Sequence, residues 1–161
     1  MHGTVVAIHI KPETPGERGL PKQPVVRARI TTTGLAGDFN RFRHEELHDD
    51  PDSAILLLPQ ETLDDLVREG WPVAPGHVGE NLTTRGIPYA EFVSGRRFIV
   101  GTAELEVTRA CTPCNNLYEL PYVGKARGAE FMKTMIGRRG WYARVVREGD
   151  VVVGAPIDGP A

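Results

Sequence analysis

The sequence lacks the features on which several large classes of protein depend. It has two cysteines in 161 residues, Cys111 and Cys114, which argues against a secreted scaffold held together by disulfides. Its longest apolar runs, residues 54–58 and 151–153, are too short to span a bilayer. The N-terminus contains no basic segment followed by an apolar run and a cleavage site. We therefore expect no secretory signal, no membrane association and a cytoplasmic location.

An excess of charge of either sign is also missing. The chain carries 19 basic and 21 acidic residues, for a net charge of −2, whereas binding to a nucleic-acid backbone requires a basic excess. We therefore expect no nucleic-acid partner, and we interpret local pairs such as Arg138 with Arg139 as solvated faces or single anion contacts. Hydrophobic residues make up 40%, as in globular proteins, and the length predicts one domain over residues 1–161.

Thirteen prolines and 18 glycines divide the chain into short segments, most of which have the composition of strands. β-Branched residues between turn formers predict strands over residues 4–10, 25–32, 54–58, 97–100, 103–108, 142–146 and 151–157. The sequence Glu148-Gly149-Asp150 suits a hairpin turn between the last two strands.

Two segments have helical periodicity instead. In residues 59–70, Leu63, Leu66 and Val67 share one face, and in residues 125–138 Phe131, Met132, Met135 and Ile136 recur at helical spacing. Many short strands with few helices favour a mainly β protein, either a barrel or a curved sheet whose openings are covered by helices.

The densest chemical signal lies directly after the predicted strand 103–108. There Cys114 follows Pro113 in a short loop, with Arg109 close by in the sequence. A cysteine held at a strand end beside basic groups can act as a nucleophile, a sulfur carrier or a soft metal ligand. A buried cysteine can equally be a small hydrophobic residue. We favour a functional role for Cys114 and the hydrophobic role for Cys111.

The C-x-x-C spacing also occurs in two other kinds of site. A thioredoxin-like redox motif lies near the start of a βαβ unit, but here the motif comes late in the chain among predicted antiparallel strands. A zinc site needs a second pair of ligands at suitable spacing, and no histidine supplies an obvious one. Both interpretations are weak.

Residues His44-Glu45-Glu46-Leu47-His48 match the H-E-x-x-H pattern of zinc proteases. That motif requires a long amphipathic helix, whereas the acidic, proline-containing sequence 49–52 follows immediately. We interpret the segment as a polar loop near the site.

Residues 75–87 combine several polar side chains with glycines. Gly79 allows a tight backbone path, and Glu80, Asn81 and Thr83 could then face an anionic or heterocyclic ligand. The alternative is a glycine-rich connection whose polar side chains bond to their own backbone. The pattern by itself favours neither.

Taken together, these segments resemble the MOSC domain family, named after the C-terminal domain of molybdenum cofactor sulfurase. The resemblance rests on Gly34-Leu35-Ala36-Gly37-Asp38, the Gly-Glu-Asn-Leu-Thr-Thr string 79–84, Pro113-Cys114 and the run 140–145, and it covers residues 4–157. It implies a MOSC-type β-barrel of mixed, mostly antiparallel strands with two or three short helices.

The resemblance also implies a link to the molybdenum cofactor, molybdopterin. In the family, the cysteine after proline carries persulfide sulfur or binds molybdenum, a role that falls on Cys114. The glycine-rich segment and Asp38 would line the same pocket, and Arg109 or Arg144 could contact the phosphate of the cofactor. Many relatives have arginine where Cys111 stands, so this chain departs from the pattern there.

Three functional hypotheses follow from the resemblance. The first is a protein that binds molybdenum or molybdopterin, or carries persulfide sulfur on Cys114 to a metal–sulfur or cofactor acceptor. The second is a molybdenum-dependent reductase of N-hydroxylated compounds that receives electrons from a partner protein. The third is a non-catalytic adaptor for a pterin or a protein. We expect neither a pyridoxal-phosphate desulfurase domain nor the extra N-terminal domain of the reductases in this chain, so a separate desulfurase would supply sulfur. No particular oligomeric state is indicated.

Overall fold

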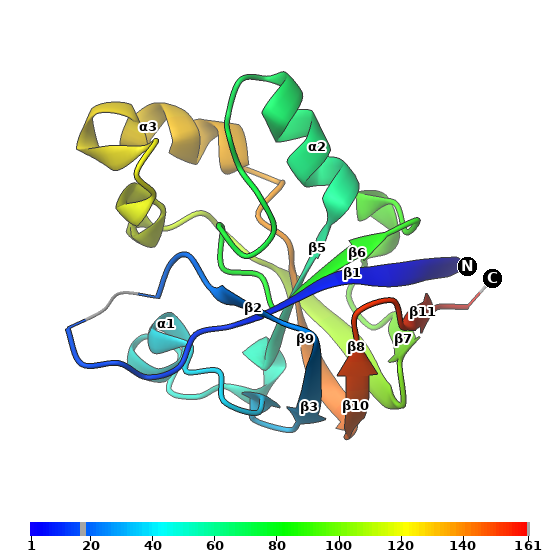
Figure 1. Cartoon of the computed structure of the whole chain (residues 1–161). Helices are drawn as coiled ribbons and strands as arrows, with labels where there is room; N and C mark the ends of the chain where they lie inside the picture. Colours follow the sequence, from blue (N-terminus) through cyan, green and yellow to red (C-terminus); the bar gives the residue numbers. More distant parts are fainter. Residues whose placement is uncertain (17–18, 161) are drawn as a thin grey trace.

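The computed structural model describes residues 1–16 and 19–160, and within these residues seven strands close into a barrel (Figure 1). Around the barrel they run β11 (Pro156–Asp158), β7 (Arg97–Val100), β8 (Ala103–Ala110), β9 (Trp141–Arg147), β5 (Ile55–Pro59), β6 (Leu82–Arg85) and β1 (His2–Ile10). Pairing of β1 with β11 completes the closure, and β2 (Gln23–Val25) adds to β1. The β5–β6 pair is parallel and the other pairs are antiparallel. The predicted mixed, mostly antiparallel barrel is confirmed.

A second sheet lies at the lower end of the barrel in Figure 1 and consists of β10 (Gly149–Val152), β3 (Arg27–Thr31) and β4 (Gly34–Leu35). The predicted hairpin at residues 148–150 is wrong, because β9 pairs with β8 and β5 whereas β10 pairs with β3. The predicted strand 151–157 is also two strands, separated where Gly154 adopts a φ of +90°. The predicted strand 25–32 divides at Val26, whose carbonyl accepts a hydrogen bond from the Val153 N–H.

Both predicted long helices are present, as α2 (Gln60–Arg68) and α3 (Gly124–Met135), and they lie together over the upper end of the barrel in Figure 1. Leu63 and Leu66 are fully buried, but Val67, expected on the same face, is 51% exposed because it lies at the edge of the apolar stripe. The ring of Phe131 in α3 packs against Trp71, which follows α2. The remaining helical segments are short: α1 (Arg41–Glu45) and the 3₁₀ turns η1 (Pro51–Ser53), η2 (Tyr89–Glu91) and η3 (Asn115–Glu119).

The described residues form two main hydrophobic clusters, one inside the barrel and one beneath α2 and α3. A smaller cluster of Leu56, Cys111 and Tyr142 lies on the side of β5 and β9 that faces the loop after β8. Each buried leucine in such clusters contributes roughly 1.5–3 kcal/mol to stability. The clusters hold β5, β8 and β9 firmly, and the loops that leave the ends of these strands are therefore held at fixed positions.

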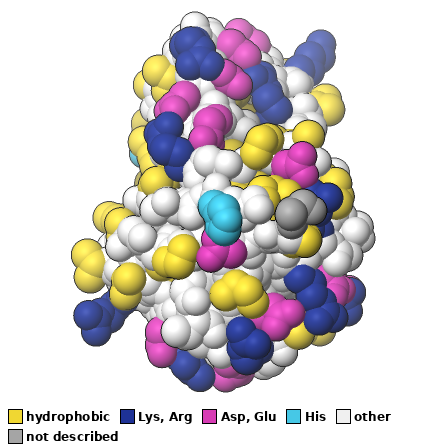
Figure 2. All heavy atoms as spheres, turned by 90° about the vertical axis from the view of Figure 1, so that its right-hand side faces the viewer, with side chains coloured by type: hydrophobic (Ala, Val, Ile, Leu, Met, Phe, Trp, Pro, Cys, Tyr) yellow, Lys and Arg dark blue, Asp and Glu magenta, His cyan; other side chains and the backbone are white. Residues whose placement is uncertain are grey.

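Two features concern the outside of the molecule. In the described part of the chain, no helix is long and apolar enough to cross a membrane. On the face shown in Figure 2, basic and acidic side chains are interspersed and hydrophobic side chains occur in small groups. Exposed ion pairs such as Arg97 with Glu106 and Arg147 with Glu104 are consistent with such mixing.

Candidate functional site

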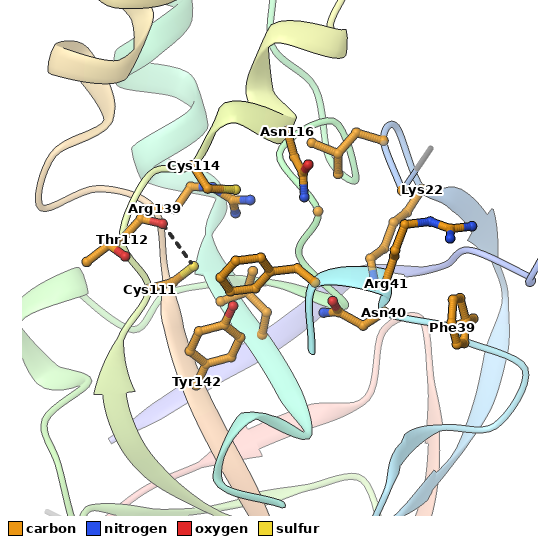
Figure 3. A pocket seen from close by; sticks show the side chains of 15 residues that line it. Lys22, Phe39, Asn40, Arg41, Cys111, Thr112, Cys114, Asn116, Arg139 and Tyr142 are labelled. Carbon is orange, nitrogen blue, oxygen red and sulfur yellow. Dashed lines mark hydrogen bonds between the residues drawn. The ribbon is translucent and has the colours of Figure 1, made fainter. Parts of the chain in front are cut away.

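A cavity lies where the loop after β8 faces α1 and the residues before β9 (Figure 3). Both cysteines contribute to its wall, together with Arg139 and Tyr142. The wall is completed by Gly19, Leu20, Lys22, Phe39, Asn40, Arg41, Phe42, Leu56, Gly79, Thr112 and Asn116. Segments from six different parts of the sequence therefore meet at one hollow.

The two thiols differ in exposure. Strand β8 ends at Ala110, so both cysteines lie just past a strand end, and Cys114 is partly exposed while Cys111 is 7% exposed. The Cys111 N–H donates to the Gly140 carbonyl at 2.8 Å, which fixes the start of the loop to the residue before β9. The Cys114 carbonyl accepts a hydrogen bond from the Leu117 N–H at 3.1 Å, which fixes the end of the loop to η3. Cys114 is consequently the thiol that solvent or a partner reaches.

Arg139 gives the cavity a permanent positive charge. Its side chain is 5% exposed, and its Nε and Nη1 atoms have no hydrogen-bond partner among the described residues. Burial by itself lowers the pKa of this guanidinium, but Cys111, Cys114, Tyr142 and Glu80 together outweigh burial and raise the pKa. Buried nitrogen atoms of a cation without hydrogen-bond partners are costly, and an anionic ligand or an ordered water molecule would satisfy them.

Tyr142 faces the cavity as a neutral phenol. Burial, and next the nearby Cys111 thiol, raise its pKa above the ordinary value, and its hydroxyl is within hydrogen-bonding reach of Cys111. Arg109 lies over the Tyr142 ring at 5.4 Å and binds the side chains of Asp50 and Ser53. Arg109 therefore supports a wall residue but is not itself part of the cavity wall.

A buried ion pair lies beneath the cavity. The ammonium of Lys22, a wall residue, donates to both carboxylate oxygens of Asp38 at 2.8 Å, and the two side chains are 4% and 1% exposed. The same carboxylate accepts from the Asn81 amide at 2.9 Å and from the Lys11 N–H at 2.7 Å. Asp38 and Asn81, both expected to face a ligand, therefore act by holding Lys22 and the surrounding backbone.

The glycine-rich segment is tied together by Glu80. This fully buried carboxyl accepts hydrogen bonds from the Gly76 N–H at 2.6 Å and from the Thr83 hydroxyl at 3.1 Å. Burial raises the pKa of Glu80, and its Oε2 atom has no hydrogen-bond partner in the described structure. Gly79 adopts a φ of +92° and does reach the cavity wall. Both sequence interpretations of this segment therefore apply in part, since its side chains bond internally while Gly79 faces the cavity.

The other expected residues lie elsewhere. Arg144 is on the outer face of β9, where it pairs with Glu106 at 3.2 Å and Asp52 at 3.6 Å, and Pro113 shapes the loop without lining the cavity. His44 belongs to α1, but His48 follows the helix with a φ of +50°, so the two imidazoles do not share a helical face. Among the described residues no group of histidine, cysteine and carboxylate side chains could hold a metal ion.

Sequence reasoning predicted only Cys114 and Gly79 among the wall residues as site residues, and the residues it missed include Lys22, Arg139 and Tyr142. Arg139 was grouped with Arg138 as a surface pair, but the two side chains diverge. Arg138 binds Glu69 on the surface through two hydrogen bonds of 2.6 and 2.8 Å, and Arg139 turns inward. The signal in the sequence was the position of Arg139 between Gly137 and Gly140. In the structure these glycines have φ values of +73° and +101° and turn the chain sharply on either side of Arg139.

The structure is a closed, mostly antiparallel barrel with a cavity that contains two thiols. Comparison of the chain with known proteins identifies the family that has this fold. The family model of the MOSC domain matches residues 44–158, and the chain belongs to the MOSC family. This membership makes it a molybdenum-cofactor-associated protein at the level of the family.

Individual relatives agree with this assignment. The chain is 30% identical over 135 residues to protein YiiM of Escherichia coli K12, and the match covers 80% of this chain and 57% of that protein. The structure of YiiM from Geobacillus stearothermophilus matches with a TM-score of 0.72 at 27% identity, over 99% of this chain and 75% of the other. The YuaD protein of Bacillus subtilis has the same fold, with a TM-score of 0.79 at 20% identity over 98% and 94% of the two chains.

Proposed function

We propose that this protein carries sulfane sulfur as a persulfide on Cys114 and delivers it to a metal–sulfur or cofactor acceptor. The observation that carries the proposal is that Cys114 shares one cavity with the buried guanidinium of Arg139, two of whose nitrogen atoms lack partners. A persulfide is an anion at neutral pH, and a buried cation attracts an anion nearby.

The step balances without an added oxidant. The Cys114 thiolate attacks the outer sulfur of a donor persulfide, R–S–S⁻, and a new sulfur–sulfur bond forms on Cys114. The donor sulfur–sulfur bond breaks, and its electron pair leaves on the donor thiolate, R–S⁻. The negative charge moves from the Cys114 sulfur to the outer sulfur of the persulfide, and the guanidinium of Arg139 stabilises this charge. Lys22 contributes less, because Asp38 already balances its charge.

Cys114 by itself could supply one soft thiolate ligand to molybdenum, and the cations suit an anionic cofactor. The space does not suit molybdopterin. The free volume enclosed by the described wall residues is about 40 Å³, and one water molecule requires about 10–15 Å³ of such volume. A few water molecules or a small terminal group fit within this volume, whereas a fused pterin ring system would have to extend beyond it. This comparison favours the sulfur carrier over stable retention of the whole cofactor.

The proposal is tested by loading the reduced protein with a persulfide donor, either glutathione persulfide or a cysteine desulfurase with cysteine. We expect a mass increase of about 32 Da, and fragmentation of the peptide 110–125 places it on Cys114. Cys114→Ser should show no gain at position 114. If wild-type protein gains no sulfur at Cys114 from either donor, the carrier proposal is wrong and an adaptor role gains support.

Two further measurements sharpen the test. Arg139→Met should slow loading about ten-fold or more, because a charge-assisted interaction is lost, whereas its matched control Arg144→Met removes an arginine outside the cavity. Equal rates for the two variants would contradict the role of Arg139. Molybdenum and pterin content should also be measured after expression in a host that makes the cofactor. Stoichiometric metal that is lost in Cys114→Ser would favour the reductase hypothesis instead.

A further inference from the structure

We infer that Cys111 is a second reactive thiol, which resolves the Cys114 persulfide by forming a Cys111–Cys114 disulfide and releasing hydrosulfide into the cavity. This inference rests on the proposed function of Cys114 and adds the fate of the carried sulfur. It assigns a chemical role to a residue that the sequence suggested was only a small hydrophobic one.

The first argument is the position of Cys111. Its side chain contributes to the wall of the cavity that contains Cys114, and Figure 3 shows both thiols on the loop beside Arg139. Cys111 is 7% exposed, so a large external thiol does not reach it as readily as it reaches Cys114. Residues 111–114 belong to neither a helix nor a strand, and a disulfide between the two cysteines requires a short Cα separation across this loop.

The second argument is the polar surroundings of Cys111. A cysteine that serves only as a small hydrophobic residue is buried among apolar atoms. Cys111 does pack against Leu56, but its thiol donates to the Thr112 carbonyl at 3.7 Å, and it lies within electrostatic reach of the Arg139 guanidinium and hydrogen-bonding reach of the Tyr142 hydroxyl. Tyr142 keeps its proton because of its burial, so it can donate a hydrogen bond to a Cys111 thiolate. In the proposed reaction, both neighbours would interact favourably with an anionic sulfur at this position.

The reaction is balanced within the protein. The Cys111 thiolate attacks the Cys114 sulfur of the persulfide Cys114–S–S⁻, and a Cys111–Cys114 bond forms. The bond to the outer sulfur breaks, and that sulfur leaves with the electron pair and takes up the proton that Cys111 gave up, as HS⁻. The two cysteines are oxidised and the sulfane sulfur is reduced to sulfide. An external thiol, such as glutathione or a dithiol protein, then reduces the disulfide and restores the starting state.

The experiment follows one round of loading without oxygen. Wild-type protein, Cys111→Ser and Cys114→Ser are loaded with glutathione persulfide, desalted quickly, and followed by intact mass and by trapping of free sulfide with monobromobimane. We expect wild-type protein to gain about 32 Da and then to fall to about 2 Da below its reduced mass, with about one sulfide released per chain. Cys111→Ser should keep the added sulfur on Cys114 and release no sulfide, and Cys114→Ser should form no disulfide.

The outcomes distinguish the role proposed for Cys111 from the carrier role proposed for Cys114. Wild-type protein that keeps its persulfide as stably as Cys111→Ser, with no sulfide released, would overturn the role of Cys111 and leave the carrier proposal intact. Failure of Cys111→Ser and wild-type protein alike to gain sulfur would overturn both. Tyr142→Phe provides a readout that a structural role would not change: release of sulfide after loading should slow about ten-fold, because a hydrogen bond to an anion is lost. An unchanged release rate would remove Tyr142 from the reaction.

Discussion

Removal of the Asp38 carboxylate should destabilise the protein more than most single substitutions do. Lys22 is buried beneath the cavity with a 4% exposed side chain, and both oxygens of Asp38 bind its ammonium at 2.8 Å. In Asp38→Ala the ammonium keeps its burial and loses its counter-charge. The Asn81 amide and the Lys11 N–H lose an acceptor at the same time.

The magnitude follows from the burial of the pair. Breaking a buried ion pair by removing one partner costs about 3–5 kcal/mol, because an uncompensated charge remains. For a chain of this size each kcal/mol lowers the melting temperature by about 2–4 °C, so we expect a decrease of about 6–20 °C. The matched control is the double variant Lys22→Met with Asp38→Ala, in which no buried charge remains. It should lose less stability than Asp38→Ala alone.

The loss should also depend on pH. Burial lowers the pKa of Lys22 below its ordinary value, and Asp38 partly offsets this, so the pKa falls further when Asp38 is removed. Between the folded and the unfolded pKa of a lysine the unfolded chain binds more protons, so stability rises with pH over that window. Asp38→Ala should therefore recover part of its lost stability as the pH is raised from 7 towards 10. Urea unfolding followed by tryptophan fluorescence measures this, and a loss under about 1 kcal/mol at pH 7 would refute the buried ion pair.

Two more predictions concern single positions. Arg139→Met should leave the free energy of unfolding within about 1 kcal/mol of wild type or raise it, because the guanidinium is buried without partners for two of its nitrogens. A loss of several kcal/mol in urea unfolding would show that Arg139 is structural. Gly76→Ala should cost about 2 kcal/mol or more, because the residue has a φ of +82° and a Cβ would overlap the His9 ring. Gly70→Ala is the control for Gly76→Ala. Gly70 has a φ of +99° and open space around it, so its substitution has only the backbone cost of about 1 kcal/mol. Equal melting temperatures for the two variants would contradict the overlap at Gly76.

The fold could be predicted from the sequence where local pattern and final packing coincide. Strands such as β7 and β8 alternate buried and exposed residues, and the ends of α2 match a proline before it and a glycine after it. The pairing partner of each strand cannot be read from the residues of that strand alone. Residues 148–150 have the composition of a hairpin turn, but Gly149 lies against the backbone of Thr102 and Ala103, and the chain passes into the second sheet there. Only the three-dimensional contact decides between these paths.

The candidate site could likewise be predicted only where the sequence carries a local pattern. Cys114 and Gly79 carry a local signature, a loop after a strand and a tight turn, and both line the cavity. Lys22 and Arg139 come from irregular segments with no periodicity, so their burial depends on which distant residues pack over them. Asp38, Glu80, Asn81 and Thr83 were expected to line one pocket, but the direction of their side chains could not be read from residue type. Buried carboxylates and amides bind backbone groups and cations as readily as they bind ligands.

The charges around the cavity, taken together, argue for an anion there. Lys22 is balanced by Asp38 at 2.8 Å, so this pair adds little net charge. Burial raises the pKa of Glu80 and thereby weakens a carboxylate that acts on Arg139. The remaining groups around the Arg139 guanidinium are the Tyr142 phenol, which keeps its proton, and the thiols of Cys111 and Cys114. Under the proposed function, a persulfide on Cys114 would add the negative charge that balances this cation.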